Sequence, residues 1–376
     1  MRTPKPSHPI PTWLGSAILI AVTVFALSGI YVAAHTSTNP GTALTLAIGA
    51  TTTPLLATPQ AATSTSSAPA SGTTAKAAAA KSAVSKLPGS SSIASSTLAA
   101  QALAGSGADL LKSIVNIVCL SSNPSIPSIS GSGVIIDSRG IILTAAHVAQ
   151  LFLLQDYLGP DTVTCLVRTG SPARRAYIAE PIYVSPSWIE NNPTTLGTTA
   201  PTGTGEDDFA LLAITGTATS TPTPSSFPAI PLTQTDPKLN EQVAIGSYGA
   251  EYLTSSELNY SLYPILVFGS VADRYTFDTN TVDLISVQGS AASQEGSSGG
   301  GMVDGSGHLV GMITTSSISG SIAGRSLNAI TPNHMRRSFY ADTGQNLDTY
   351  LADNSLPDLV AAFKADSSKL AALLRY

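Results

Sequence analysis

The chain has 376 residues, of which 43% are hydrophobic and only 11% are charged. The low charge argues against the highly charged type of disordered chain, which has too few apolar groups for a core. The formal net charge of -5 argues against nucleic acid as the main partner, because phosphate binding requires a basic surface.

Residues 14–34 form an uncharged, apolar segment, and a membrane-spanning helix needs about 20 such residues. Arg2 and Lys5 precede it, which predicts that residues 1–13 are cytoplasmic and that the rest of the chain is outside. A cleaved signal peptide is the alternative, but its apolar core is usually only about 7–15 residues long. We therefore expect a single-pass anchor. Both interpretations place the following domain outside the cytoplasm, in the periplasm or on the cell surface.

Residues 35–106 are mostly Ala, Ser, Thr, Pro and Gly. Such a segment buries too little apolar surface to offset its ordering entropy, so we expect a disordered linker. Two stretches within it, residues 74–86 and 93–104, have weak helical character. No acidic residue precedes Asp109, and the change of composition there predicts that the globular domain begins near residue 107.

From residue 107 to residue 345, short β-rich runs alternate with turn residues, which predicts an all-β sandwich or barrel. The domain is long enough for two barrels of six strands. The expected strands cover residues 113–120, 133–136, 140–143, 162–168, 210–214, 242–245, 263–271, 282–287 and 309–314.

The only cysteines, Cys119 and Cys165, both lie in apolar strand-like runs. Two cysteines are too few for a disulfide scaffold or a four-cysteine zinc site. They are either two buried thiols or, outside the cytoplasm, one disulfide. The sequence leaves both possibilities open.

The end of the chain has helical character. Thr331 and Pro332 have the residue types of an N-cap and a first helical position. Residues 346–376 have apolar residues at helical spacing, which predicts a tail of one or two short amphipathic helices.

Three short motifs contain residues suited to chemistry. They are Thr144-Ala145-Ala146-His147, Asp208-Phe209-Ala210-Leu211-Leu212 and Gly296-Ser297-Ser298-Gly299-Gly300. Each of these motifs, taken alone, more often has a structural role than a catalytic one. Together they are significant, because a serine nucleophile needs a base and the base needs an acid to orient it. The order His, Asp, Ser is one of the known orders of such triads.

In this order, the motifs resemble those of trypsin-like serine peptidases, most closely the bacterial Deg/HtrA type, over about residues 110–340. The resemblance implies a chymotrypsin-like double six-stranded β-barrel. It also implies that Ser298 is the nucleophile, His147 the base and Asp208 the orienting acid. Asp208 is preferred to Asp207 because the family's aspartate precedes x-Ala-x-Leu.

The resemblance assigns the oxyanion hole to the backbone N–H groups of Gly296 and Ser298. Ala292 occupies the position that carries the charge in trypsin, so cleavage after Lys or Arg is not expected. The other wall of the specificity pocket would be formed by Ile313, Thr314 and Thr315. We expect a small or medium apolar residue before the cut.

Three departures from the family pattern are visible. Ser297 replaces the aspartate that accepts the new N-terminus in activated zymogens, and Gly301 replaces the usual proline. We also expect no PDZ-like domain after residue 345. The mechanism requires no cofactor and no metal, and His308 and His334 are expected at the surface.

The sequence therefore predicts a membrane-tethered, extracytoplasmic serine endopeptidase in envelope protein quality control or processing. Its expected partners are protein or peptide substrates, the membrane through the N-terminal helix, and other copies of the chain in a homo-oligomer, a trimer by analogy. The main alternative is a catalytically silent binding or scaffold protein on the same fold. A structural surface protein with coincidental motifs is the third interpretation.

Overall fold

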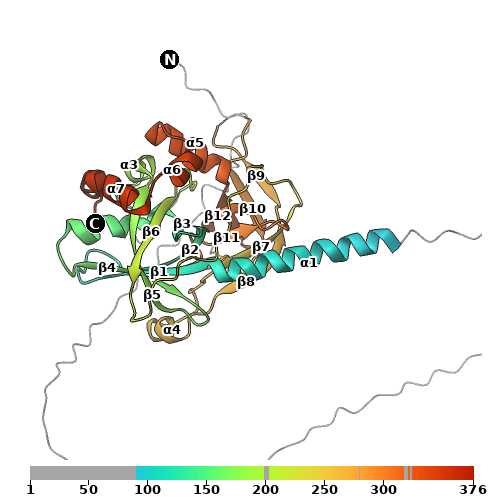
Figure 1. The fold of residues 1–376 in the computed structure, drawn as a ribbon, viewed down its shortest axis with the longest axis horizontal. Helices are drawn as coiled ribbons and strands as arrows, with labels where there is room; N and C mark the ends of the chain where they lie inside the picture. The colour runs from blue at the N-terminus through green and yellow to red at the C-terminus, as the bar shows by residue number, and fades with distance from the viewer. Residues whose placement is uncertain (1–89, 199–202, 279, 317–320, 322–323) are drawn as a thin grey trace, which may run out of the picture. The chain divides into compact units, whose positions relative to one another are not determined.

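The computed structural model describes residues 90–198, 203–278, 280–316, 321 and 324–376 (Figure 1). The expected cytoplasmic N-terminus, the anchor at 14–34 and residues 35–89 of the expected linker lie outside this part. Among the helices that are described, none combines the length and the apolar character needed to cross a membrane.

The first half of the domain forms a closed, six-stranded antiparallel barrel with the strand order β1-β2-β3-β6-β5-β4. Its strands are β1 (Ile114–Ser121), β2 (Ile129–Asp137), β3 (Ile141–Thr144), β4 (Val163–Thr169), β5 (Arg174–Val184) and β6 (Ala210–Thr217). The barrel confirms the β-architecture expected for this half. The sequence analysis missed β5, in which polar and apolar residues do not alternate regularly.

The second half forms a seven-stranded sheet with the order β8-β7-β11-β12-β13-β10-β9. Its strands are β7 (Gln242–Ser247), β8 (Ile265–Ser270), β9 (Asp273–Tyr275), β10 (Leu284–Gln288), β11 (Gly301–Val303), β12 (Leu309–Ser316) and β13 (Ser326–Ile330). The prediction of a second six-stranded barrel was therefore wrong in its strand number. In the described chain, the end strands β8 and β9 are not paired with each other. The extra strand β9 is short and polar, so no apolar run in the sequence indicates it.

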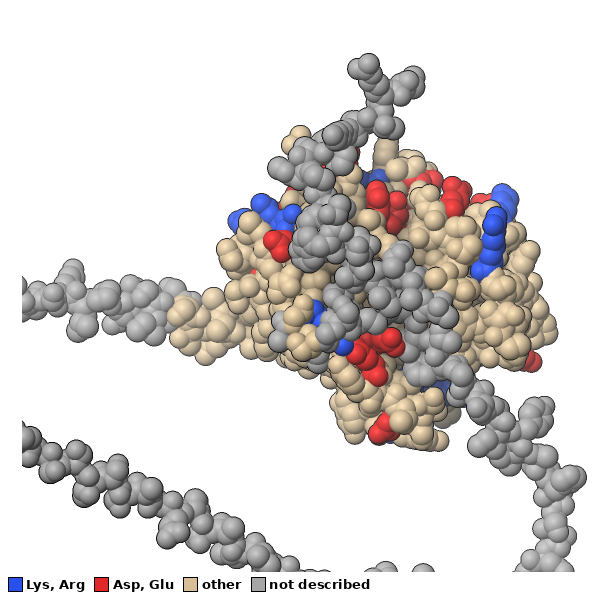
Figure 2. Space-filling view, turned by 180° about the vertical axis from the view of Figure 1, so that it is seen from behind, with Lys and Arg blue, Asp and Glu red and all other residues tan. Residues whose placement is uncertain are grey.

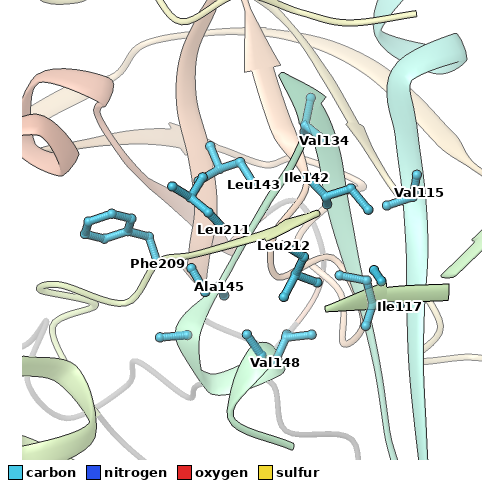
Figure 3. Close-up of a cluster of buried hydrophobic side chains, with 14 of the residues drawn as sticks. Val115, Ile117, Val134, Ile142, Leu143, Ala145, Val148, Phe209, Leu211 and Leu212 are labelled. Atoms are coloured by element: carbon cyan, nitrogen blue, oxygen red, sulfur yellow. The ribbon is translucent and has the colours of Figure 1, made fainter. Parts of the chain in front are cut away.

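Alternating apolar residues of the first barrel fill its interior, as Figure 3 shows for Val115, Val134 and Ile142 among others. Gly133 allows close packing there, because a Cβ at this position would lie 2.7 Å from Cγ2 of Ile142. This core supports strands β3 and β6; His147 follows β3 in α2, and Asp208 precedes β6.

Helix α1 spans Ser90–Ser113, so the prediction that residues 90–106 belong to a disordered linker was wrong. Alanine and leucine favour helix, and α1 buries Leu103 and Leu110. Its C-terminal part packs against β7, whereas its N-terminal part extends away from the strands (Figure 1). The ordered unit therefore begins upstream of the predicted boundary at residue 107.

The remaining helices lie around the two sheets. They are α2 (Ala146–Tyr157), α3 (Pro186–Asn191), η1 (Thr195–Gly197), α4 (Ser255–Tyr260), α5 (Pro332–Thr343), α6 (Leu347–Asp353) and α7 (Leu356–Ala371). Helix α5 begins as predicted, with Thr331 as its N-cap. Helix α7 packs against β5 and α2, so the expected tail is part of the domain.

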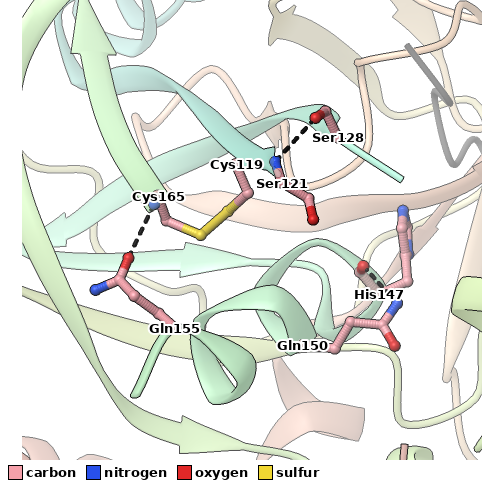
Figure 4. Close-up of a disulfide and its surroundings, with 7 residues drawn as sticks. All are labelled: Cys119, Ser121, Ser128, His147, Gln150, Gln155 and Cys165. Atoms are coloured by element: carbon pink, nitrogen blue, oxygen red, sulfur yellow. Dashed lines mark hydrogen bonds between the residues drawn. A yellow bond between two sulfur atoms is a disulfide. The ribbon is translucent and has the colours of Figure 1, made fainter. Parts of the chain in front are cut away.

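Cys119 and Cys165 form a disulfide between the paired strands β1 and β4 (Figure 4). This resolves the question that the sequence left open. The backbone N–H of Cys165 also donates to Gln155 Oε1 at 2.8 Å, which links the bridged strand to α2.

Acidic and basic side chains lie interspersed on a mostly uncharged surface on the face shown in Figure 2. Nucleic-acid binding requires a concentrated basic surface. This face does not have one.

Candidate active site

His147 and Asp208 lie just beyond the paired ends of β3 and β6, where Thr144 faces Ala210. Nδ1 of His147 lies 2.7 Å from Oδ2 of Asp208, and the backbone N–H of His147 donates to Oδ1 at 2.9 Å. The side chains are only 1% and 0% exposed. The carboxylate therefore holds one side of the imidazole and leaves Nε2 for proton transfer.

Thr314 in β12 provides a further contact to Asp208. Its hydroxyl donates to Oδ2 of Asp208 at 2.6 Å. A buried carboxylate is stabilised by such donors, since its charge has lost the hydration available in water. Thr314 belongs to the second sheet, so it connects that sheet to the His–Asp pair of the barrel.

Ser298 lies on the glycine-rich turn between β10 and β11. Gly299 in this turn has φ +87°, and a Cβ there would lie 2.0 Å from the carbonyl oxygen of Ser132, so only glycine fits. The hydroxyl of Ser298 donates to the carbonyl oxygen of Thr314 at 3.4 Å. Nε2 of His147 has no hydrogen-bond partner within the described residues.

The backbone of the turn orients the two N–H groups expected in the oxyanion hole. The carbonyl of Glu295 accepts from Ala250 at 2.7 Å, and the carbonyl preceding Ser298 accepts from Gly300 at 2.9 Å. C=O and N–H point in opposite directions in a trans peptide. The N–H groups of Gly296 and Ser298 therefore face away from these donors, and neither has a protein partner in the described part of the chain.

Ser132 in β2 holds the same turn from the barrel. Its hydroxyl donates to the carbonyl of Gly296 at 2.8 Å and accepts from the N–H of Tyr248 at 2.8 Å. Its own N–H donates to the carbonyl of Ser298 at 2.7 Å. The sequence analysis recognised a glycine-rich strand here, but nothing in one sequence distinguishes this serine from an ordinary strand residue.

The residues predicted to line the specificity pocket occupy different environments. Ala292 is fully buried, and Ile313 belongs to the same apolar cluster and bonds the nucleophile turn through its backbone. The hydroxyl of Thr314 faces Asp208, and that of Thr315 accepts from Asn328 at 3.2 Å. The side chains of Ala292 and Ile313 are both buried in the core. Substrate contact by the four residues remains a prediction.

Trp188 in α3 is a buried neighbour of the site that the sequence analysis did not identify. Its ring centroid lies 6.5 Å from that of His147, and its side chain is 2% exposed. Tryptophan is rare in this chain, which is a weak signal, but its position beside the imidazole depends on the fold.

His334 is buried, so the prediction that it lies at the surface was wrong. Its Nε2 lies 3.3 Å from Oδ1 of Asp207, and its Nδ1 lies 3.4 Å from Oδ1 of Asp283. Arg337 also contacts Asp283. The adjacent acids Asp207 and Asp208 therefore face different histidines.

The charges of this second cluster shift its pKa values. Burial alone would lower the pKa of His334, but Asp207 and Asp283 outweigh burial and raise it above 6.5. Burial alone would raise the pKa of Asp283, but His334, Thr281 and Phe277 hold it well below its usual range. The pKa of Asp207 is also lowered, because His334 and Ser338 outweigh the effect of burial.

A barrel and a sheet that meet around a buried His–Asp pair and a serine turn have the architecture of the chymotrypsin-fold serine peptidases. Residues 131–312 match the family described as a trypsin-like peptidase domain. The chain therefore contains a trypsin-like peptidase domain and is a serine endopeptidase.

Two solved structures are similar to this chain. One is titled "Crystal structure of Deg5"; it is 16% identical with a TM-score of 0.41, and the match covers 65% of this chain and 96% of that chain. The other is the active form of the Rv3671c protease from M. tuberculosis; it is 17% identical with a TM-score of 0.40, and the match covers 64% and 85% of the two chains. No curated protein matches the sequence.

Proposed function

We propose that this chain is a membrane-tethered, extracytoplasmic serine endopeptidase that hydrolyses peptide bonds through His147, Asp208 and Ser298. The observation that carries the proposal is the double contact of Thr314. Its hydroxyl bonds Asp208, and its carbonyl accepts from Ser298, so the acid and the nucleophile share one support.

The first half of the reaction forms an acyl-enzyme. The hydroxyl of Ser298 turns toward Nε2 of His147 and attacks the scissile carbonyl carbon as His147 takes its proton. His147 then gives this proton to the leaving amine, and the C–N bond breaks. Asp208 stabilises the imidazolium between these steps. In the second half, water attacks the acyl carbon as His147 takes its proton. His147 then gives this proton to the oxygen of Ser298 as the ester bond breaks, which releases the new C-terminus and the free serine.

The oxyanion of each tetrahedral intermediate would bind the N–H groups of Gly296 and Ser298. Their orientation before substrate arrives favours catalysis, because prealigned donors need no reorganisation during the reaction.

A small or medium apolar residue before the cut fits the apolar surroundings of Ala292. Neither Ala292 nor Ile313 offers a charge to pair with Lys or Arg. The backbone of β12 near Thr315 is the proposed pairing edge for the substrate.

The tether and the location rest on the apolar segment 14–34 and the basic residues before it. The disulfide supports a site outside the cytoplasm, since disulfides persist in oxidising compartments. Envelope protein quality control or processing is the role we propose there. The Deg/HtrA resemblance adds a homotrimer, with residues 94–112 of α1 as the proposed contact.

The test uses the full chain in mild detergent beside its Ser298→Ala variant, with a fluorophosphonate probe and unfolded casein. We expect labelling and cleavage in the parent and neither in the variant. Ser306→Ala, which alters an exposed turn serine, is the matched control and should behave as the parent. A folded parent that is neither labelled nor active would favour the silent scaffold.

A further inference from the structure

The nucleophile turn lacks the ion pair that holds it in activated trypsin-like zymogens. Ser297 stands at the position of the aspartate, and its hydroxyl accepts from Ser247 at 3.0 Å instead. This contact carries no charge. Another interaction must therefore keep the adjacent peptides in the orientation that the oxyanion hole requires.

An ion pair with a buried arginine contacts the segment that leads to this turn. Arg325 is 4% exposed and forms a bidentate pair with Glu251, at 2.6 Å from Nη1 to Oε2 and 2.9 Å from Nη2 to Oε1. Nη1 also donates to the carbonyl of Ser293 at 2.8 Å. The backbone carbonyl of Arg325 accepts from Gly289 at 2.8 Å. One arginine thus joins the loop after β7 to the segment that leads to the nucleophile.

The position of Glu251 connects this pair to the oxyanion hole. Its neighbour Ala250 donates the hydrogen bond that holds the carbonyl of Glu295. The packing is close, since a Cβ on Gly296 would lie 3.3 Å from the nitrogen of Ala250. A shift of the segment containing Ala250 and Glu251 would release the Glu295–Gly296 peptide and redirect the N–H of Gly296.

The charges around Arg325 show why its loss would move this segment. Burial and the charge of Glu251 raise the pKa of Glu295, while Arg325 lowers it. The carboxyl groups of Glu251 and Glu295 therefore both interact with the guanidinium of Arg325. Without the arginine, two acidic side chains would face each other with less water than they need.

We propose that the Arg325–Glu251 ion pair is a positioning device that keeps the oxyanion hole of this peptidase formed in the absence of substrate. The inference rests on the proposed roles of Ser298 and Gly296. It assigns to two side chains the task that the missing aspartate performs elsewhere.

The test compares Arg325→Met and Glu251→Gln with the parent in the full chain. We expect Arg325→Met to lower kcat on unfolded casein by about 10²-fold, the effect of losing one oxyanion donor. KM should change by less than about threefold, because the interaction acts in the transition state. The rate of fluorophosphonate labelling should fall in parallel.

Two further variants distinguish positioning from general stability. Arg325→Lys keeps the charge but not the bidentate geometry and should recover about tenfold of the lost rate. The double variant Arg325→Met/Glu251→Gln should be no slower than Arg325→Met, since both changes break one interaction. Arg336→Met is the control: this arginine of α5 also pairs with an acid, Asp348 of α6, and bonds a backbone carbonyl, that of Thr233, away from the nucleophile turn.

The outcomes separate the two proposals. If labelling requires Ser298 but Arg325→Met keeps kcat within about twofold of Arg336→Met, the positioning role is wrong. A rise in KM at unchanged kcat would also overturn it, in favour of a pocket-wall role through Ser293. If labelling is independent of Ser298, the proposed function itself fails. If circular dichroism shows that Arg325→Met does not fold, the same comparisons of kcat and KM are made with Glu251→Gln.

Discussion

Thr314 shows how one residue serves two others. Its hydroxyl and its carbonyl point to Asp208 and Ser298, respectively. The side chain is fully buried, so water cannot replace the hydroxyl if it is removed. A hydrogen bond to a charged group contributes about 1.5–3 kcal/mol.

We expect Thr314→Val to lower kcat/KM about 10- to 100-fold, because each 1.36 kcal/mol of lost transition-state stabilisation is about tenfold. Valine keeps the size and removes only the donor. The measurement is steady-state cleavage of casein by the full chain, with thermal unfolding to verify the fold.

Thr314→Ser is the matched variant, since it keeps the hydroxyl. It should retain most of the activity. Equal loss in the serine and valine variants would indicate that packing of the methyl group, rather than the bond to Asp208, is what matters.

At the scale of elements, the disulfide joins two strands that already pair. Cys119 lies directly opposite Cys165 in the register of β1 and β4, and 46 positions separate them in sequence. The bridge closes a long loop in the unfolded chain and thereby reduces its entropy.

Cys119→Ala/Cys165→Ala is expected to lower the free energy of unfolding by about 2–5 kcal/mol, the usual effect of losing a native disulfide. Urea denaturation of the full chain measures it. Reduction of the parent with dithiothreitol should give a similar loss. An unchanged midpoint in both experiments, or two free thiols in the isolated full chain, would contradict the prediction.

At the scale of the whole molecule, the His334 cluster connects the two halves of the domain. Asp207 precedes β6 of the barrel, Asp283 precedes β10 of the sheet, and His334 lies in α5. Among the residues that the structure describes, Arg337 on α5 and Glu206 beside Asp207 also face the cluster.

This cluster makes stability depend on pH. The pKa of His334 is raised in the folded state, so its contribution is complete below 6.5 and is lost as pH rises through the folded pKa. The pKa values of Asp207 and Asp283 are lowered, so their contribution is complete above 3.8 and is lost at lower pH. The cluster should stabilise the fold most between these two values.

Urea unfolding of the full chain from about pH 5 to 9 measures this dependence. His334→Gln should be less stable at the acidic end of the range and should remove part of the decline toward alkaline pH. The opposite result, a variant whose loss of stability grows as pH rises, would exclude a charged His334 in the folded protein.

The sequence alone predicted the candidate triad and much of the framework. His147, Asp208 and Ser298 were selected because their types, order and immediate neighbours match a triad. All nine expected strands are present, because apolar β-branched runs bounded by turn residues are local signals. The N-cap Thr331 was predicted for the same reason: a cap depends on a few adjacent residues.

Only the tertiary structure decided which distant groups meet. Ser132 lies in the barrel and Ser298 on the turn before β11, and Arg325 and Glu251 belong to loops far apart in the chain. No local pattern therefore indicates either contact. The short strand β9 has no apolar run that would indicate it in the sequence. His334 is buried because the packing of α5 places its side chain between Asp207 and Asp283. Such contacts depend on how distant segments pack in the whole domain. Residue types and spacing within one sequence do not indicate which distant segments will pack together.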